Sequence, residues 1–165
     1  MIKDNQRKGM TDMKVTIVPG KTEHLESVVG ILEGSDLGKM YFADKDLRRM
    51  LAKVFEKKEI HLALNEKNQC IGFIFTELTG TFGKYPYLHI MAVDENCRGR
   101  GVGKTLHRFF EEVLTADYDQ LYLMVGDFNP RGKKLYLTLG YKEIGNLPDF
   151  YAPGVTETLM VKYKE

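Results

Sequence analysis

A glycine-rich, positively charged stretch, residues 92–110, carries the clearest chemistry in the sequence; it reads AVDENCRGRGVGKTLHRFF. Glycines let a backbone come close to a ligand and present its N–H groups. The helix predicted after the last glycine would add unpaired N–H groups and the positive end of its dipole, a place that phosphate prefers. The stretch therefore predicts a pyrophosphate-binding loop. Its glycines and basic residues lie within Arg98, Gly99, Arg100, Gly101, Val102, Gly103 and Lys104.

Three phosphate-loop patterns compete for this stretch. The P-loop pattern G-x-x-x-x-G-K-[ST] needs a glycine where the sequence has Arg98, and the dinucleotide pattern G-x-G-x-x-G needs a different glycine spacing. The pattern R-x-x-G-x-G fits, with Arg98, Gly101 and Gly103. It resembles the coenzyme A loop of the GNAT superfamily of acyl-CoA-dependent N-acyltransferases. The alternative interpretation, in which the stretch binds no ligand, is an ordinary glycine-rich turn with exposed basic residues.

A second motif begins at Asn129, a good helix N-cap that is followed by proline. Asn129, Gly132 and Tyr136 are spaced to share one helix face, and the bare face at Gly132 would let a ligand or another backbone approach. The motif N-x-x-[AG]-x-x-L-Y-x-x-x-G-[FY], which extends to Tyr141, resembles the second sequence block of GNAT acetyltransferases. Both blocks occur in the family's order and spacing, and the resemblance covers residues 13–163.

The resemblance implies a role for each matching position. The strand backbone at Met91, Ala92 and Val93 would pair with the pantetheine arm of acetyl-CoA, in a slot that the family makes by splaying two strands apart. Residues 98–104 would hold the pyrophosphate. Asn129, beside Gly132, would contact the cofactor arm, and Tyr136 would stand beside the thioester sulfur. The family reaction is direct acetyl transfer from acetyl-CoA to an amine in a ternary complex, without a metal.

The reaction needs a base for the amine and a donor for the departing thiolate. A lysine-type amine is protonated at neutral pH, with a pKa of about 10.4. Tyr136 is the candidate donor. The base stays open, because the positions where several relatives carry a glutamate look like Tyr87 and Met124 here. His89 has a suitable pKa range but is more simply interpreted as structural. Glu77, Asp127 and a water chain to bulk solvent are the other candidates.

The acceptor pocket of this family is lined by two loops, which here look like residues 35–42 and 145–154. Their carboxylates would attract a cationic amine, and their aromatic rings would stack on it. Solvated loop charges and packing are the alternative interpretation. A polyamine, an amino acid derivative, a peptide N-terminus and a lysine side chain all fit. The candidate acceptor residues are Asp36, Tyr41, Phe42, Glu77, Asp149 and Tyr151.

The elements that position these residues follow from the hydrophobic periodicity. Together they predict an α+β fold, an α/β/α sandwich, in which a mixed, mostly antiparallel seven-stranded sheet has helices on both faces. We expect strands at 13–19, 60–64, 70–78, 85–93, 120–125, 141–144 and 157–162. We expect helices at 22–33, 44–57 and 129–139, and one after the glycine loop. The apolar face of that last helix is Leu106, Phe109, Phe110, Val113 and Leu114.

The composition fits one globular domain: 165 residues, 43% hydrophobic and 28% charged, with a net charge of +1. This charge gives no reason to expect nucleic acid or a membrane surface as a partner. Residues 1–12 lack an apolar signal core and are expected to form an N-terminal tail before a single N-acetyltransferase domain at 13–165. We expect a cytoplasmic protein, monomer or homodimer, with Cys70 and Cys97 as free thiols.

Two other functions stay open at this point. A non-catalytic acyl-CoA-binding or sensing module on the same fold is favoured by the missing strand glutamates and opposed by the retained Tyr136. A nucleotide-binding P-loop protein is disfavoured by Arg98 and by the lack of an apolar strand that ends in an aspartate for magnesium.

Overall fold

The computed structural model describes residues 13–164, so the tail expected at residues 1–12 lies outside the described part. Seven strands form one sheet, as predicted, and their order in it is β1-β2-β3-β4-β5-β7-β6. Every neighbouring pair is antiparallel except β4 and β5, which are parallel. The strands are β1 (Thr16–Pro19), β2 (Ile60–Leu64), β3 (Cys70–Thr81), β4 (Tyr85–Val93), β5 (Gln120–Gly126), β6 (Lys142–Pro148) and β7 (Thr156–Tyr163).

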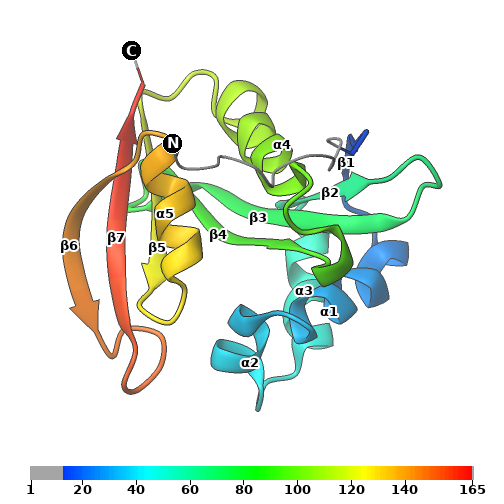
Figure 1. Cartoon of the computed structure of the whole chain (residues 1–165), viewed down its shortest axis with the longest axis horizontal. Helices are drawn as coiled ribbons and strands as arrows, with labels where there is room; N and C mark the ends of the chain where they lie inside the picture. Colours follow the sequence, from blue (N-terminus) through cyan, green and yellow to red (C-terminus); the bar gives the residue numbers. More distant parts are fainter. Residues whose placement is uncertain (1–12, 165) are drawn as a thin grey trace, which may run out of the picture.

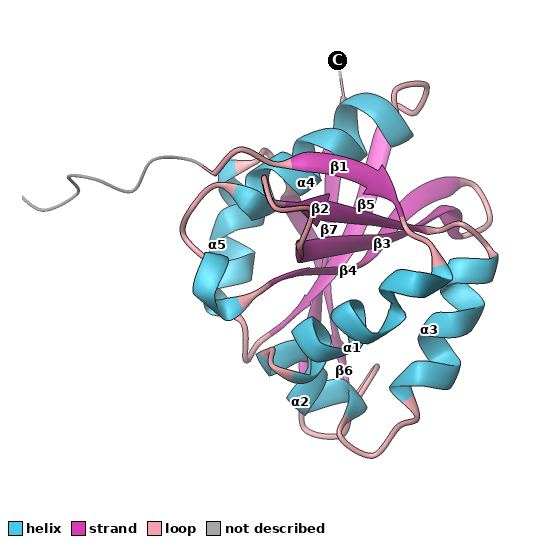
Figure 2. Ribbon diagram, turned by 90° about the vertical axis from the view of Figure 1, so that its right-hand side faces the viewer, coloured by secondary structure: helices cyan, strands magenta, loops and turns pink. Residues whose placement is uncertain are grey.

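Helices cover both faces of the sheet (Figures 1 and 2). One core lies under α1 and α3, where Leu32, Leu51 and Phe73 are fully buried. A second core lies under α4 and α5 and contains Phe110 and Met160. The predicted sandwich is therefore confirmed. The helices are α1 (Leu25–Glu33), α2 (Asp36–Phe42), α3 (Leu47–Glu56), α4 (Val102–Phe109) and α5 (Pro130–Thr138).

The parallel pair β4–β5 separates after a short contact. Only Tyr87 pairs with Tyr122 and Leu88 with Leu123. Beyond these pairs β4 continues to Val93 and β5 to Gly126 without a shared ladder. Figure 1 shows the two strands running apart. The unpaired edge of β4 thus offers backbone N–H and C=O groups to a ligand, as an edge strand does.

A β-bulge at His89 changes which side chains of β4 face each core. Leu88 is opposite Thr76 and Ile90 is opposite Phe75, so His89 is an extra residue without an opposite partner on β3. Leu88 packs in the core under α4 and α5, whereas Ile90 packs in the core under α1 and α3. Regular alternation would have put both on the same face.

Three local expectations were wrong. Residues 35–42 do not form a loop but contain α2, which Ser35 caps by accepting a hydrogen bond from the Gly38 amide at 2.9 Å. Strand β6 runs on to Pro148, so much of the loop expected at 145–154 is strand. Val113 does not lie on the apolar face of α4: it is 61% exposed, because residues 110–114 form a wider π-helical turn that alters the helical spacing.

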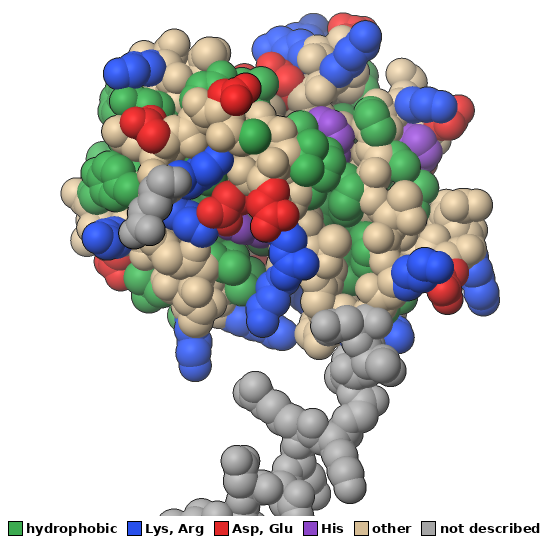
Figure 3. Space-filling view, turned by 90° about the horizontal axis from the view of Figure 1, so that it is seen from above, with side chains coloured by type: hydrophobic (Ala, Val, Ile, Leu, Met, Phe, Trp, Pro, Cys, Tyr) green, Lys and Arg blue, Asp and Glu red, His purple; other side chains and the backbone are tan. Residues whose placement is uncertain are grey.

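The surface carries both signs of charge. On the face seen from above, acidic and basic side chains are interspersed among apolar ones (Figure 3). Among the ion pairs of the described residues, Lys133 contacts Glu143 at 3.0 Å, and Lys162 pairs with Glu111. Within residues 13–164, no helix combines the length and the apolar character that crossing a membrane requires.

Candidate active site

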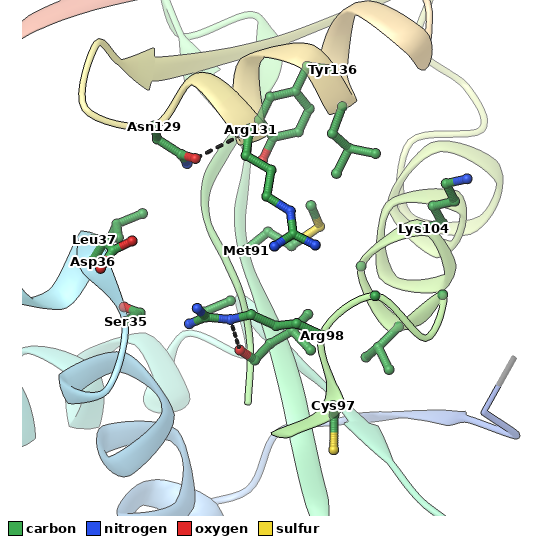
Figure 4. Close-up of a pocket in the computed structure, with 18 of the residues that line it drawn as sticks. Ser35, Asp36, Leu37, Met91, Cys97, Arg98, Lys104, Asn129, Arg131 and Tyr136 are labelled. Carbon is green, nitrogen blue, oxygen red and sulfur yellow. Dashed lines mark hydrogen bonds between the residues drawn. The ribbon is translucent and has the colours of Figure 1, made fainter. Parts of the chain in front are cut away.

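A cavity of about 750 Å³ opens between the splayed strands, α4 and the starts of α2 and α5. Figure 4 shows its walls, with Arg98 and Lys104 on one side and Asn129, Arg131 and Tyr136 on the other. The cavity contains the backbone edge of β4 that β5 leaves unpaired. It brings together all the residues predicted to bind the cofactor: Met91, Ala92, Val93, Arg98, Gly99, Arg100, Gly101, Val102, Gly103, Lys104, Asn129, Gly132 and Tyr136.

Positive charge dominates this cavity. Asp36 is the single acidic residue among the described residues that line it. Arg108 and Arg131 were not predicted, because each lies outside the two sequence motifs or at a variable position within them. Several guanidinium and ammonium groups around one space suit a ligand with several phosphates. The basic residues are Arg98, Arg100, Lys104, Arg108 and Arg131.

The N-terminus of α4 is built by the glycine loop. Gly101 is the N-cap and has a left-handed φ of 81°, a conformation that other residues rarely adopt. Its carbonyl accepts hydrogen bonds from the amide and the hydroxyl of Thr105, at 3.0 and 3.1 Å, which fixes the first turn. The amides that begin the helix are left without helical partners, and Val102 and Gly103 line the cavity. A helix start of this kind favours an anion, so the pyrophosphate site stays a prediction for this loop.

Arg98 also contacts the edge of β4. Its Nε donates a hydrogen bond to the carbonyl of Val93 at 3.2 Å, as drawn in Figure 4. The side chain is therefore held over the strand edge next to the anion site. A ligand arm that pairs with this carbonyl would have to displace the guanidinium, which is then free to turn toward a phosphate.

Gly132 has a local function that the sequence analysis did not foresee. The Asn129 side chain accepts a hydrogen bond from the Gly132 amide at 2.9 Å and so caps α5. A Cβ at residue 132 would lie 2.5 Å from Asn129 Nδ2. The glycine thus makes room for the cap itself. The Asn129 carboxamide is held at the cavity wall.

Tyr136 lies where this cavity meets a second one. The second cavity, of about 280 Å³, shares Leu37, Met91, Phe128, Asn129 and Tyr136 with the first. Tyr136 is 8% exposed, and its hydroxyl forms no hydrogen bond with another residue among 13–164. Burial raises the pKa of Tyr136 to about 12. The hydroxyl is therefore a protonated donor at neutral pH.

The second cavity is mainly apolar and aromatic, and Glu157 is the one carboxylate among its described lining residues. The residue is 1% exposed, and its carboxylate accepts a hydrogen bond from the hydroxyl of Tyr41. Sequence reasoning missed Glu157. The available signal was a glutamate that shares the alternating register of Leu159 and Val161 in the strand TETLMVKY.

His89 is held on three sides. Its Nε2 lies 2.7 Å from Glu77 Oε2, its ring stacks on Phe75 at 4.6 Å between centroids, and Tyr87 meets it edge-on at 4.5 Å. Both strands β3 and β4 therefore fix the imidazole next to the bulge. His89 lines the second cavity, but these contacts favour the structural interpretation that the sequence analysis preferred.

Residues 26–164 match the profile of the Acetyltransferase (GNAT) domain family. The chain belongs to the GNAT acetyltransferase family. A curated relative is an uncharacterized N-acetyltransferase of Methanocaldococcus jannaschii, 32% identical over 78 residues; the match covers 45% of this chain and 49% of the relative. The chain thus matches about half the length of that relative.

Solved GNAT structures share the fold. Ard1 from Thermoplasma volcanium superposes with a TM-score of 0.75 at 19% identity, covering 92% of this chain and 98% of that one. The paia N-acetyltransferase from Thermoplasma acidophilum, solved in complex with coenzyme A, superposes with a TM-score of 0.71 at 17% identity, covering 92% and 100%. At these identities the likeness shows the fold alone.

The residues expected in the acceptor pocket of this GNAT chain divide into three groups. Tyr41, Phe42 and Tyr151 line the second cavity. Asp36 lines the first cavity instead, and Glu77 reaches the second cavity only through its contact with His89.

Asp149 lines neither cavity. It is exposed, has a positive φ of 54°, and accepts a hydrogen bond from the Gly154 amide at 2.6 Å. Its carboxylate therefore shapes the β6–β7 turn rather than an amine site. The Asp127 carboxylate likewise accepts a hydrogen bond from the Thr156 amide, at 3.3 Å.

Within residues 13–164, no group of three or more His, Cys, Asp or Glu side chains could hold a metal ion.

Proposed function

We propose that this chain transfers the acetyl group of acetyl-CoA to a primary amine by direct attack in a ternary complex. One observation carries the proposal: a basic cavity at a helix N-terminus and an aromatic cavity meet at Tyr136, whose hydroxyl has no hydrogen-bond partner among residues 13–164. Family membership supports acetyl transfer in general. The acceptor is a small molecule, a peptide N-terminus or a lysine side chain.

Acetyl-CoA would lie along the first cavity. Its pyrophosphate would bind the free amides at the start of α4 and the surrounding arginines. Its pantetheine arm would add to the unpaired edge of β4 at Met91 and Val93, with the Asn129 carboxamide on the opposite wall. This direction puts the thioester at the junction beside Tyr136.

The amine would enter through the second cavity and reach the thioester carbonyl at the same junction. As the new N–C bond forms, negative charge grows on the carbonyl oxygen, and backbone amides of β4 near the bulge at His89 would bind it. The C–S bond then breaks. The hydroxyl of Tyr136 donates to the departing sulfur, which leaves as the CoA thiol.

The decisive experiment is a thiol-release assay with acetyl-CoA across a library of primary amines, with the acetylated product identified by mass spectrometry. Binding of CoA is measured in parallel by thermal shift; saturation at a hundredfold excess over the dissociation constant should stabilise the fold by about 2.7 kcal/mol. Transfer to at least one amine class is expected. Tight CoA binding with no transfer to any amine would instead indicate an acyl-CoA-binding module.

A further inference from the structure

Glu157, at the start of β7, is a buried carboxylate without a cation. It is 1% exposed and lines the second cavity. Within residues 13–164, no Lys, Arg or His forms an ion pair with it. Burying an ion is costly unless it is paired, because the ion loses its hydration. A ligand that brings a positive charge would supply the missing partner.

One oxygen of this carboxylate is available to such a ligand. Oε1 accepts the hydrogen bond from Tyr41, while Oε2 has no hydrogen-bond partner among residues 13–164. Among the described residues, the polar side-chain atoms that are both inaccessible to solvent and without a hydrogen-bond partner belong to Glu59, His61 and Thr81. Glu157 Oε2 is not one of them. Oε2 therefore keeps access to the cavity that its residue lines.

Aromatic rings surround the same space. Tyr41 meets Phe128 at 5.3 Å and Tyr151 at 5.8 Å between ring centroids. The hydroxyl of Tyr151 lies 2.8 Å from that of Tyr87. All four rings line the cavity with Glu157. A carboxylate among several aromatic rings is a favourable environment for an ammonium group, which ring faces also attract.

The chain makes room for this arrangement at Gly126. In the ladder of β5 and β7, Gly126 is opposite Glu157. A Cβ at residue 126 would lie 2.6 Å from the Tyr41 hydroxyl and 2.4 Å from the Phe128 ring. Any larger residue would push these two side chains away from the carboxylate, so the missing side chain is part of how the site is built.

The rest of the cavity is mainly apolar, with Leu37, Met50 and Phe75 among its lining residues. Lys45 is the single lysine or arginine among the described lining residues; it is exposed and lies over the Phe42 ring at 5.4 Å. A second ammonium group or a carboxylate on the acceptor would meet few polar partners here, and burying it would cost free energy. A small, singly charged ligand with an apolar body fits best.

We propose that Glu157 is the amine-binding group of this enzyme, and that the acceptor is a small primary monoamine with an apolar or aromatic body. The inference rests on the proposed acetyl transfer. Glu157 Oε2 accepts a hydrogen bond from the ammonium, and the rings of Tyr41, Tyr87, Phe128 and Tyr151 enclose it.

Glu157 also receives the first proton of the reaction. The ammonium gives one proton to Oε2, and the freed lone pair forms the N–C bond to the acetyl carbon. The C–S electron pair goes to sulfur, which takes the proton of the Tyr136 hydroxyl, and the second amine proton then restores that hydroxyl. Glu157 then releases its proton to solvent. The titratable or charged groups around it are Tyr41 on α2, Lys45 before α3, Tyr87 and His89 on β4, Asp127 after β5, Tyr136 on α5 and Tyr151 before β7.

The test measures amine binding and turnover separately. Calorimetry with the CoA-bound full chain uses 2-phenylethylamine as the probe, with phenylalanine, spermidine and an alanyl peptide for comparison. We expect 2-phenylethylamine to bind at least tenfold more tightly than each of the others. Glu157→Gln, which keeps the shape of the side chain, should weaken this binding and lower kcat/KM at least a hundredfold.

Controls separate this effect from misfolding and from loss of the cofactor. Glu66→Gln, in the exposed turn between β2 and β3, should behave as wild type, and the affinity of Glu157→Gln for CoA should be unchanged. Equal binding of the amine by wild type and Glu157→Gln would overturn the inference, as would a preference for phenylalanine, spermidine or the peptide.

The inference and the proposed function fail in different ways. Amine binding that depends on Glu157, without any transfer to an amine, would contradict acetyl transfer and keep the binding site. Transfer that survives Glu157→Gln within threefold would keep acetyl transfer and remove Glu157 from it.

Discussion

The hydroxyl of Tyr41 donates a hydrogen bond to the buried carboxylate of Glu157, across 116 residues of sequence. It joins α2 to β7 at the end of the splayed strands. Burial raises the pKa of Glu157, and the hydrogen bond from Tyr41 opposes that rise. The pair therefore sets how strongly the carboxylate holds a proton in the proposed amine site.

Tyr41→Phe should move the acid limb of the kcat/KM profile to higher pH. The variant keeps the ring but removes the hydrogen bond that lowers the pKa of Glu157. Because only the ionised carboxylate accepts a proton, kcat/KM on the acid limb should fall about tenfold for each unit by which the pKa of Glu157 rises, since one pKa unit corresponds to about 1.4 kcal/mol. A pH–rate profile measures this. Tyr85→Phe, outside both cavities, is the control. An acid limb at the same pH in Tyr41→Phe and wild type would contradict a catalytic role for Glu157.

Glu157→Gln should raise the melting temperature at neutral pH. The folded-state pKa of Glu157 lies above its ordinary value, so the folded protein binds this proton more tightly than the unfolded chain does. The carboxylate's contribution to stability consequently falls as pH rises from about 4.5 through the folded pKa. The increase in melting temperature caused by Glu157→Gln should be largest above that pKa and shrink below about pH 4.5. Melts at several pH values test this, and a gain of the same size at every pH would contradict it.

Tyr136→Phe should lower kcat by about a hundredfold, in the range for lost general acid catalysis. The KM for acetyl-CoA should change little, since the lost interaction acts in the transition state. The melting temperature should also stay unchanged, because the hydroxyl has no hydrogen-bond partner among residues 13–164 and the ring still packs. Steady-state kinetics and thermal melts, with the exposed Tyr163→Phe as control, distinguish this from a structural tyrosine. Near-normal turnover would exclude the donor role.

Gly103→Glu should abolish CoA binding while the chain still folds. Gly103 lies in the first turn of α4 with a Cβ position at least 3.8 Å from the nearest neighbours, so a side chain fits there. A carboxylate would occupy and repel the phosphate position. Gly30→Glu is the matched control, because Gly30 is also helical and open. Calorimetry with CoA gives the result; unchanged affinity would place the pyrophosphate elsewhere.

The sequence by itself determined the local structure on the proposed cofactor side of the site. The loop at 98–104 and the cap that joins Asn129 to Gly132 are made by residues a few positions apart, so their conformations follow from local rules about glycines and N-caps. The strands were found for the same reason: alternation of apolar side chains is a local pattern. The helix at 36–42 was missed because Gly38 lies in its middle and weakens the local signal.

The acceptor side was decided by the tertiary structure. In the sequence, Asp149 and Glu157 are equally good candidates for a carboxylate that binds an amine. In the structure, the Asp149 carboxylate accepts a hydrogen bond from a backbone amide in the turn before β7. Glu157 faces the cavity because of its register opposite Gly126, the bulge at His89 and the divergence of β4 from β5. These depend on pairings between distant segments, and no pattern within one segment records which partner a strand will meet or where a bulge will turn its face.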